Sequence, residues 1–295
     1  MNARVLRLHV HSVGRLAEPV SRAVAVENGS RIIVLGGLAS GDVTTSRVVA
    51  IDPNSWTSRA DGQLREAVHD ASGAALGGHA VVFGGGASTE VAATQSWTDG
   101  TTRIIGALPG PRSDSSATTV RTTAYVAGGF NGSSMDRAVL ATGNGRSFRT
   151  VAYLKQGVRY AAVAALDGAI YVIGGELATT EGTSTGPQSR LVQRIDPATG
   201  RTRVVGRLPW GIGHAMAFAI DGRLYLAGGR RGTQATARIW RIDPDNGRPT
   251  PAGRLPQAIS DSAVAHDGSR SVVFVGGETS GPYEPQRGIV TITLR

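Results

Sequence analysis

A motif in which a buried apolar run of about five residues is closed by two glycines recurs six times along this chain of 295 residues. The clearest copy reads Asp167-Gly168, then Ala169–Ile173, then Gly174-Gly175. The steps between successive pairs are 48, 44, 46, 54 and 48 residues. A period of this length filled with short strands is typical of a β-propeller, in which each repeat forms one blade. The other five pairs are Gly36-Gly37, Gly84-Gly85, Gly128-Gly129, Gly228-Gly229 and Gly276-Gly277.

The two ends of the chain complement each other. Residues 4–16 alternate apolar and polar side chains, as a half-buried strand does. They end in Gly14-Arg15-Leu16, which resembles the end of the last strand in later repeats, such as Gly62-Gln63-Leu64. After the sixth glycine pair there is room for one further strand, Gly288–Leu294. We therefore predict that the N-terminal strand completes the last blade, which removes exposed strand edges.

The sequence thus predicts an all-β fold: a six-bladed propeller with four antiparallel strands per blade, forming a single domain over residues 1–295. The Asp-Gly pairs at Asp167, Asp221 and Asp267 predict type I′ turns between the first and second strands of their blades. Trp56 is expected on the fourth strand of the first blade. The blade limits are expected near 17–64, 65–108, 109–154, 155–208, 209–255, and 256–295 together with 4–16.

Three features together resemble the kelch-repeat family over the whole chain. They are the glycine pair after the second strand, an Ile-Asp-Pro that ends the third strand at 51–53, 195–197 and 242–244, and Trp56 on the expected fourth strand. Family blades usually carry a tyrosine shortly before the glycines, and here only Tyr125, Tyr171 and Tyr225 do so. The resemblance implies the fold, whereas propellers host unrelated functions.

Composition excludes several classes of function. The chain has no cysteine, so disulfides and thiolate metal sites are absent, as is the cysteine-linked tyrosine of galactose oxidase, a kelch relative. The histidines do not form a ligand set, and we expect no metal and no cofactor. The net charge of +9 comes from arginines scattered through every repeat, with no aromatic–basic cluster, so no nucleic-acid partner is expected.

The apolar runs are too short to cross a bilayer, so we expect a soluble chain without membrane insertion. We also expect a monomer. If Met1 is the native start, the absence of a signal peptide places the protein in the cytoplasm; if the chain is an excised ectodomain, it lies outside the cytoplasm.

Polar residues are expected to gather at one mouth of the central channel. In a four-stranded blade, the loop that enters the first strand and the loop that leaves the second emerge on the same face. The residues after the glycine pairs include Phe130, Glu176, Arg230 and Glu278. Sixteen residues earlier, blades two to five carry Asp70, Asp114, Tyr160 and His214. With Asp261 from blade six and the neighbouring arginines, the predicted ligand-binding residues are Asp70, Arg112, Asp114, Phe130, Arg159, Tyr160, Glu176, His214, Arg230, Asp261 and Glu278.

The arginines of this set suggest an acidic or sugar-like ligand. Arg112, Arg159 and Arg230 offer fork-shaped donors for a carboxylate, and Phe130 and Tyr160 can stack on a ring. The alternative is that Glu176, Arg230 and Glu278 only neutralise one another across neighbouring blades.

Two functions follow from these predictions. The first is a binding module that presents its loop-rich face, including the long loops 176–190 and 278–288, to a protein or glycan. The second is a sugar-active isomerase resembling the kelch sialic acid epimerases (mutarotases), which would act on an acidic sugar with Glu176, His214 and Glu278 as candidate catalytic residues. We favour the binding module, because no residue set forms a complete catalytic motif.

Overall fold

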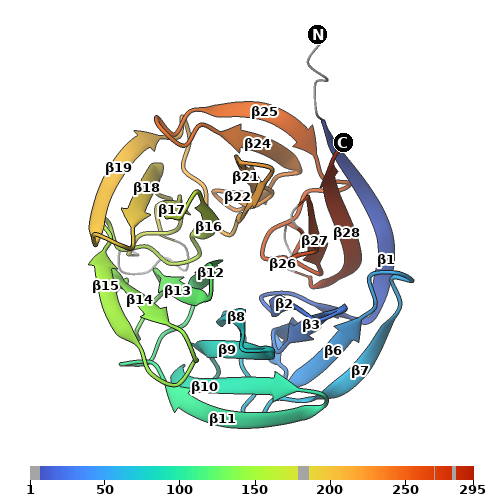
Figure 1. Ribbon diagram of the computed structural model, residues 1–295. Coiled ribbons are helices and arrows are strands. Elements are labelled where there is room, and N and C mark those ends of the chain that lie inside the picture. Colours follow the sequence, from blue (N-terminus) through green and yellow to red (C-terminus); the bar gives the residue numbers. More distant parts are fainter. Residues whose placement is uncertain (1–6, 179–185, 269, 281–283) are drawn as a thin grey trace.

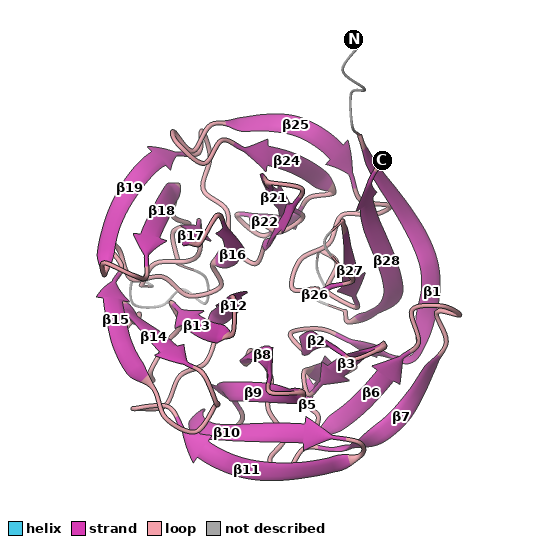
Figure 2. Cartoon of the chain, viewed as in Figure 1, coloured by secondary structure: helices cyan, strands magenta, loops and turns pink. Residues whose placement is uncertain are grey.

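The computed structural model describes residues 7–178, 186–268, 270–280 and 284–295. Six four-stranded antiparallel sheets stand around a central axis, as the predicted six-bladed propeller requires (Figure 1). The described residues form strands, turns and loops without any helix (Figure 2), and accordingly none of them forms a helix suited to crossing a membrane.

In each blade the first strand lies nearest the axis and the last lies at the periphery (Figure 1). Two short hairpins, β4 (Leu38–Ala39) with β5 (Val43–Thr44) and β22 (Arg230–Arg231) with β23 (Gln234–Ala235), follow the second strand of blades one and five. From the axis outward, blade one is formed by β2 (Val24–Asn28), β3 (Arg31–Leu35), β6 (Arg47–Ile51) and β7 (Ser58–Gln63), and blade two by β8 (Ser72–Leu76), β9 (His79–Gly86), β10 (Glu90–Thr98) and β11 (Thr101–Ala107). Blade three is formed by β12 (Ser116–Val120), β13 (Thr123–Ala127), β14 (Ala138–Thr142) and β15 (Arg149–Tyr153), and blade four by β16 (Ala162–Leu166), β17 (Ala169–Ile173), β18 (Leu191–Asp196) and β19 (Arg201–Arg207). Blade five is formed by β20 (Met216–Ile220), β21 (Arg223–Ala227), β24 (Arg238–Ile242) and β25 (Pro249–Arg254), and blade six by β26 (Ala263–His266), β27 (Ser271–Val275), β28 (Gln286–Leu294) and β1 (Leu8–Val20).

The ring is closed by the predicted pairing of the two ends. Strand β1 pairs antiparallel with β28, from Leu8 opposite Leu294 to Val20 opposite Gln286. Beyond this ladder, the backbones of Arg7 and Arg295 exchange hydrogen bonds of 2.9 and 3.1 Å. The N-terminal strand extends to Val20, beyond the predicted end at residue 16, and residues 4–6 of the prediction lie outside the described residues.

Each glycine pair links its blade to the next one. Gly174 and Gly175 have φ values of 65° and 96°, a region that favours glycine. The Gly175 N–H donates a 2.8 Å hydrogen bond to the carbonyl of Ile212 in the following blade, and a Cβ on Gly174 would collide with that oxygen. The same bond, at 2.8–2.9 Å, joins the second glycine of the other five pairs to the carbonyls of Val68, Arg112, Val158, Ile259 and Val20.

Apolar clusters fill the spaces between blades. One cluster joins Tyr171 and Ile173 of blade four to Leu224, Leu226 and Trp240 of blade five. The core is therefore divided into layers between the sheets, and the glycine bonds lie at the inner edge of these layers.

Two local predictions were wrong. Trp56 lies in the turn that precedes β7: its N–H donates to the Asp52 carbonyl at 2.7 Å, and its φ of 56° ends the turn in the left-handed region. The Asp267-Gly268 turn is not type I′, because the φ of Asp267 lies outside the left-handed region. The Asp267 N–H donates to the Ser271 carbonyl. Asp167 and Asp221, each followed by a glycine of positive φ, do adopt the backbone of that turn type.

Candidate functional site at the channel mouth

One residue from each blade contributes to a ring at one mouth of the channel. The six residues of this mouth ring all have φ between 50° and 57°. Each backbone N–H donates to the carbonyl of the ring residue in the preceding blade, at 2.8–3.1 Å, so that six hydrogen bonds form a closed circle. The left-handed conformation costs a non-glycine residue about 1–2 kcal/mol, and the circle of hydrogen bonds offsets that cost. The ring consists of Arg22, Asp70, Asp114, Tyr160, His214 and Asp261.

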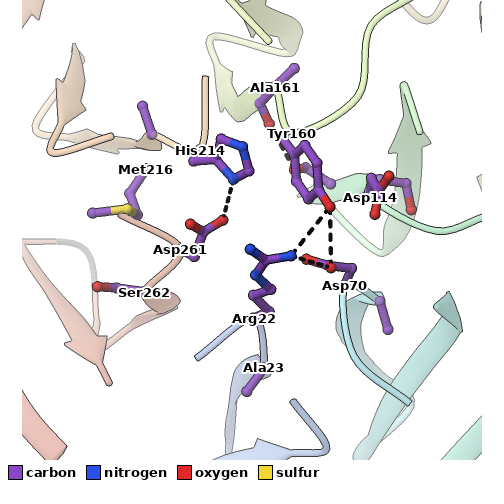
Figure 3. Close-up of a pocket in the computed structure, with 14 residues that line it drawn as sticks. Arg22, Ala23, Asp70, Asp114, Tyr160, Ala161, His214, Met216, Asp261 and Ser262 are labelled. Atoms are coloured by element: carbon purple, nitrogen blue, oxygen red, sulfur yellow. Dashed lines mark hydrogen bonds and ion pairs between the residues drawn. The ribbon is translucent and has the colours of Figure 1, made fainter. Parts of the chain in front are cut away.

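The ring side chains surround a small cavity of about 100 Å³ (Figure 3). The His214 imidazole and the Asp261 carboxylate face each other on one side, and Arg22, Asp70 and Tyr160 meet on the other. Tyr160 lies between the two groups, with its ring stacked on His214 at a centroid distance of 4.0 Å.

We call one side of the mouth the paired arc. His214 Nδ1 lies 2.7 Å from Asp261 Oδ1, and its Nε2 lies 3.2 Å from Glu176 Oε1. Arg230 Nη2 lies 3.2 Å from Asp261 Oδ2 and also contacts Glu278 Oε2, while its Nε donates to Ser260 Oγ at 2.9 Å. Every charged group in this arc thus has an oppositely charged partner. The paired arc comprises Glu176, His214, Arg230, Asp261 and Glu278.

These contacts fix the protonation states of the paired arc. Burial lowers the pKa of His214, but the charge of Asp261 and the hydrogen bonds to Asp261 and Glu176 outweigh it and raise that pKa to about 9. Burial opposes ionisation of Asp261 and Glu176 as well, yet the positive His214 holds the pKa of both carboxyls below their ordinary values. At neutral pH His214 is an imidazolium that donates through both nitrogens, so it has no free lone pair to act as a base.

The other side of the mouth, the open arc, is less completely paired. Arg22 Nη1 lies 3.1 Å from Asp70 Oδ2, while its Nε donates to Glu278 at 2.8 Å. Arg159 Nη1 is 3.6 Å from Asp114 Oδ2, beyond hydrogen-bond length, and its Nη2 bonds Glu176 at 3.3 Å. The Tyr160 hydroxyl lies 3.4 Å from Asp70 Oδ2. The open arc comprises Arg22, Asp70, Asp114, Arg159 and Tyr160.

The two aspartates of the open arc hold their protons more tightly than ordinary carboxyls. Burial and the negative charge of Asp70 raise the pKa of Asp114 to about 7, and the charge of Arg159 opposes this shift only in part. Burial also raises the pKa of Asp70 against the pull of Arg22. A carboxyl that titrates near neutrality therefore lines the cavity.

A count of charges explains which carboxyls of the mouth have a raised pKa. The two arcs hold five carboxyls, on Asp70, Asp114, Glu176, Asp261 and Glu278, and four cations, on Arg22, Arg159, Arg230 and His214. With all carboxyls ionised the mouth has a net charge of −1. The paired arc has three of the carboxyls and two of the cations, but Arg22 and Arg159 of the open arc also contact Glu278 and Glu176, so each carboxylate of the paired arc contacts two cations. Asp70 and Asp114 contact one arginine each, so the surplus charge is least compensated at these two aspartates.

The predicted site residues occupy three kinds of position. Asp70, Asp114, Tyr160, His214 and Asp261 line the cavity. Three residues pack behind the ring and are only 1–4% exposed: Glu176, Arg230 and Glu278. Arg159 and Phe130 lie outside the cavity lining, and the Arg159 Cζ is 6.0 Å from the centroid of the Phe130 ring. Arg112 also lies outside that lining: its Nε pairs with Asp136 at 3.1 Å and its Nη1 donates to the carbonyls of Gly128 and Ala138.

Sequence reasoning missed Arg22 as a site residue. The spacing of sixteen residues before the position after the glycine pair, applied to Leu38 in blade one, gives Arg22. Its guanidinium reaches Asp70, Tyr160 and Glu278, so it links the open arc to the paired arc.

Below the mouth ring, the first strands line the channel with small side chains. Every second residue faces the axis. The next layer down is Ala23, Ala71, Ser115, Ala161, Ala215 and Ser262, and the third is Ala25, Gly73, Ala117, Val163, Ala217 and Val264. The lowest layer is Glu27, Ala75, Thr119, Ala165, Ala219 and His266. We call these three layers the shaft; its lower part has a volume of about 440 Å³, against about 100 Å³ for the cavity at the mouth ring.

Among the residues that the structure describes, no group of three or more His, Asp or Glu side chains is placed to hold a metal ion.

Comparison with known proteins agrees with the fold. A sequence model of the kelch motif matches residues 217–248, which span most of blade five from β20 to the turn after β24. A search of curated proteins finds no match. The solved structure entitled "Structure of YjhT" superposes with a TM-score of 0.78 at 14% identity, covering 95% of this chain and 98% of that one. With a kelch motif matched in blade five and six glycine-linked blades closed by β1, the chain is a six-bladed β-propeller that contains a kelch motif.

Proposed function

We propose that the protein is a binding module that holds its ligand at the channel mouth. The observation that supports this proposal is the convergence of one side chain from every blade on a single cavity, with the surplus carboxyl charge on one side of it. A closed circle of backbone hydrogen bonds keeps the positions of these side chains fixed, and a preorganised site binds with a smaller entropic cost.

The loops around this mouth enlarge the surface available to a protein or glycan. Gln188 donates from its side-chain amide to the Gly232 carbonyl at 3.0 Å and accepts from the Gly232 N–H at 2.9 Å, which ties the end of the long loop 176–190 to blade five. Residues 179–185 and 281–283 of the two long loops lie outside the described residues.

The contacts of the three arginines weaken the case for an acidic ligand. Arg230 contacts Glu278 and Asp261, Arg159 pairs with Glu176 and Asp114, and Arg112 faces away from the cavity. A ligand carboxylate at Arg230 or Arg159 would have to displace a protein carboxylate that is already in place. The cavity wall offers an uncompensated negative charge instead.

An isomerase acting on a sugar is the second candidate, and one observation favours it. Asp114 lines the cavity and has a pKa of about 7, which suits a general acid and base at neutral pH. The catalytic residues predicted from the sequence are less suited to act as a general acid and base. Glu176, His214 and Glu278 are all held in ion pairs behind or beside the ring.

A thermal-shift screen tests the binding module. The purified chain is heated with acidic sugars, neutral sugars, amines and short peptides, and a ligand present at about 100 times its Kd raises the free energy of unfolding by about 2.7 kcal/mol. We expect one class to raise the melting temperature of the wild type and to lose that effect in Asp114→Asn. The matched control is Glu66→Gln, which removes an exposed carboxylate that does not line the cavity. A ligand whose shift survives in Asp114→Asn would place the binding surface elsewhere.

The isomerase is tested separately by NMR. Sugars that produce a thermal shift are mixed with the protein, and the rate of interconversion of their anomers or epimers is followed. Catalysis that falls at least 100-fold in Asp114→Asn would support the enzyme, whereas an unchanged rate of interconversion beside tight binding would support the binding module alone.

A further inference from the structure

We propose that the mouth and shaft together bind a linear aliphatic amine, including polyamines, with an ammonium group between Asp70 and Asp114 and the methylene chain in the shaft. This inference rests on the proposed function, because it names the ligand class for the same mouth. It is drawn from the charges of the ring, the composition of the shaft and the geometry of the open arc.

The charge of the mouth favours a monovalent cation. The nine ionisable groups of the two arcs carry a net charge of −1 when all the carboxyls are ionised, as counted above, and one ammonium group brings this sum to zero. Asp70 and Asp114 are only 8% and 7% exposed, so an unbalanced charge on them is poorly solvated. A cation placed between them would replace the missing solvation.

The open arc also supplies suitable hydrogen-bond acceptors. An ammonium group has three N–H donors and no acceptor. The carboxylates of Asp70 and Asp114 and the hydroxyl oxygen of Tyr160 border the same cavity. An inorganic divalent cation fits less well, because Ca²⁺ and Mg²⁺ need six or more oxygen ligands, and the described residues contain no cluster of three carboxyl or imidazole side chains placed for a metal.

The shaft selects for a slender, unbranched body. Its upper two layers contain alanine, serine, glycine and valine only, and the cavities at the mouth and along these layers share lining residues, so they form one continuous passage. The cavity volumes increase from about 100 and 150 Å³ at the top to about 440 Å³ at the bottom. A methylene chain can contact the alanine methyl groups there without requiring hydrogen bonds.

The lower end of the shaft distinguishes a simple alkylamine from a polyamine. Glu27 lies in the lowest layer, four residues along the chain from Ala23 of the top layer, which corresponds to about 13 Å along an extended strand. A second or third ammonium group of an extended polyamine can approach this carboxylate. A monoamine cannot use it, so Glu27 should affect the binding of polyamines alone.

Binding of the amine must compete with a proton. Asp114 titrates near neutrality, and the groups that face it are Asp70 and His69 from blade two, Arg22 from blade one, and Arg159 and Tyr160 from blade four. Among these, only Asp70 and Asp114 have a raised carboxyl pKa, and aliphatic amines keep their charge over this range. With a pKa of about 7 at Asp114, the deprotonated fraction rises about tenfold between pH 6 and pH 8.

Isothermal titration calorimetry of the full chain tests the inference with two probes, spermidine and hexylamine, at pH 6, 7 and 8. We expect both to bind at the mouth, with affinities that rise about tenfold from pH 6 to pH 8 and with proton release at pH 7, measured by comparing two buffers of different ionisation enthalpy. Asp114→Asn should weaken both probes at least tenfold. Glu27→Gln should weaken spermidine and leave hexylamine unchanged, and the exposed control Glu66→Gln should affect neither.

Three outcomes would overturn the inference. They are the absence of binding by either amine, equal affinity in Asp114→Asn and wild type, and an equal loss in the Glu66→Gln control, which would indicate general attraction to surface charge. The amine inference and the proposed function can be tested independently of each other. If an acidic or neutral sugar binds in the thermal-shift screen and loses its effect in Asp114→Asn while the amines do not bind, the mouth is a ligand site and only the amine is wrong.

Discussion

The paired arc and the open arc both contain ring residues at equivalent positions of the repeat, but their carboxylates are compensated to different degrees. In the paired arc, His214 bonds Glu176 and Asp261, and Arg230 contacts Asp261 and Glu278. In the open arc, Asp70 and Asp114 share the cavity wall, and the nearest cation to Asp114 is 3.6 Å away. The pKa of Asp261 is lowered whereas that of Asp114 is raised, although both aspartates are buried. The same propeller position thus stabilises the fold on one side and lowers its stability on the other.

This difference indicates a division of roles around the mouth. Groups that stabilise a protein already have their partners, whereas binding groups are often left with unfavourable interactions that a ligand relieves. Burial alone does not distinguish the carboxylates of the two arcs, because all five of these side chains are only 1–7% exposed. The number of oppositely charged neighbours of each carboxylate does distinguish the two arcs.

Breaking the paired arc should have the largest effect on stability. Arg230→Ala removes the partner of Glu278 and Asp261 and leaves both carboxylates buried. We expect the free energy of unfolding to fall by about 3–5 kcal/mol, measured by chemical denaturation. Arg238→Ala, which removes an exposed arginine from the same blade, is the control. If Arg230→Ala melts like the wild type, the ion pairs of this arc are not what stabilises the mouth.

The pH dependence of stability should show the contribution of His214. Its pKa is about 9 in the folded protein and about 6.5 in the unfolded chain, so the stabilisation is complete below pH 6.5 and is lost as the pH rises through 9. The expected loss is about 3 kcal/mol, from denaturation curves collected between pH 6 and pH 10. His214→Gln should be less stable at pH 6 and should show a flatter curve. A wild-type curve without a decline over this range would contradict the ion-paired imidazolium.

Removing the surplus charge of the open arc should stabilise the protein. The folded-state pKa of Asp114 is about 7, so its ionisation opposes folding at every pH above the unfolded value of about 3.8, with the full effect reached above pH 7. Asp114→Asn should therefore raise the free energy of unfolding at pH 8 by about 2 kcal/mol and should have little effect at pH 4. Destabilisation at pH 8 would show that Arg159 needs this carboxylate more than the surplus charge harms the fold.

The boundary between the arcs should give the smallest effect. Tyr160→Phe removes a hydroxyl that lies 3.4 Å from Asp70 and 3.3 Å from Arg22 but keeps the ring that stacks on His214. We expect a loss of about 1 kcal/mol and a further rise in the pKa of Asp70, measured by NMR titration. Tyr160→Leu, which also removes the stacked ring, should cost more. Equal losses in the two variants would assign the contribution of Tyr160 to its hydroxyl.

Much of the fold followed from the spacing of the glycine pairs. Each pair has a backbone that favours glycine and a blade-to-blade hydrogen bond, so the constraint is local and appears directly in the sequence. The closure by β1 was also predictable, because both ends of the chain lacked one part of a repeat. The position of Trp56 was not predictable from the sequence, because the length of the turn after Asp52 depends on the backbone geometry of that turn and not on residue type.

The positions of the mouth residues were predictable, but their partners were not. A fixed distance from the glycines identified four of the six ring residues, and the same rule identifies Arg22 when it is applied to blade one. Asp261, in blade six, lies one residue further from its glycine pair. Arg112 lies two residues before the ring residue Asp114, outside the cavity lining, and its guanidinium pairs with Asp136. Which carboxylate pairs with which arginine depends on contacts between blades, and the order of residues within one repeat does not contain that information.

The circle of six backbone hydrogen bonds has a consequence for how such a protein can change over evolutionary time. The donors and acceptors of the circle belong to the main chain, so its geometry does not depend on which side chain each blade contributes. Arginine, aspartate, tyrosine and histidine already occupy six equivalent places with nearly the same φ. A substitution at one of them can alter the recognised chemistry while the other five keep their positions. Specificity in this fold can therefore be revised one blade at a time.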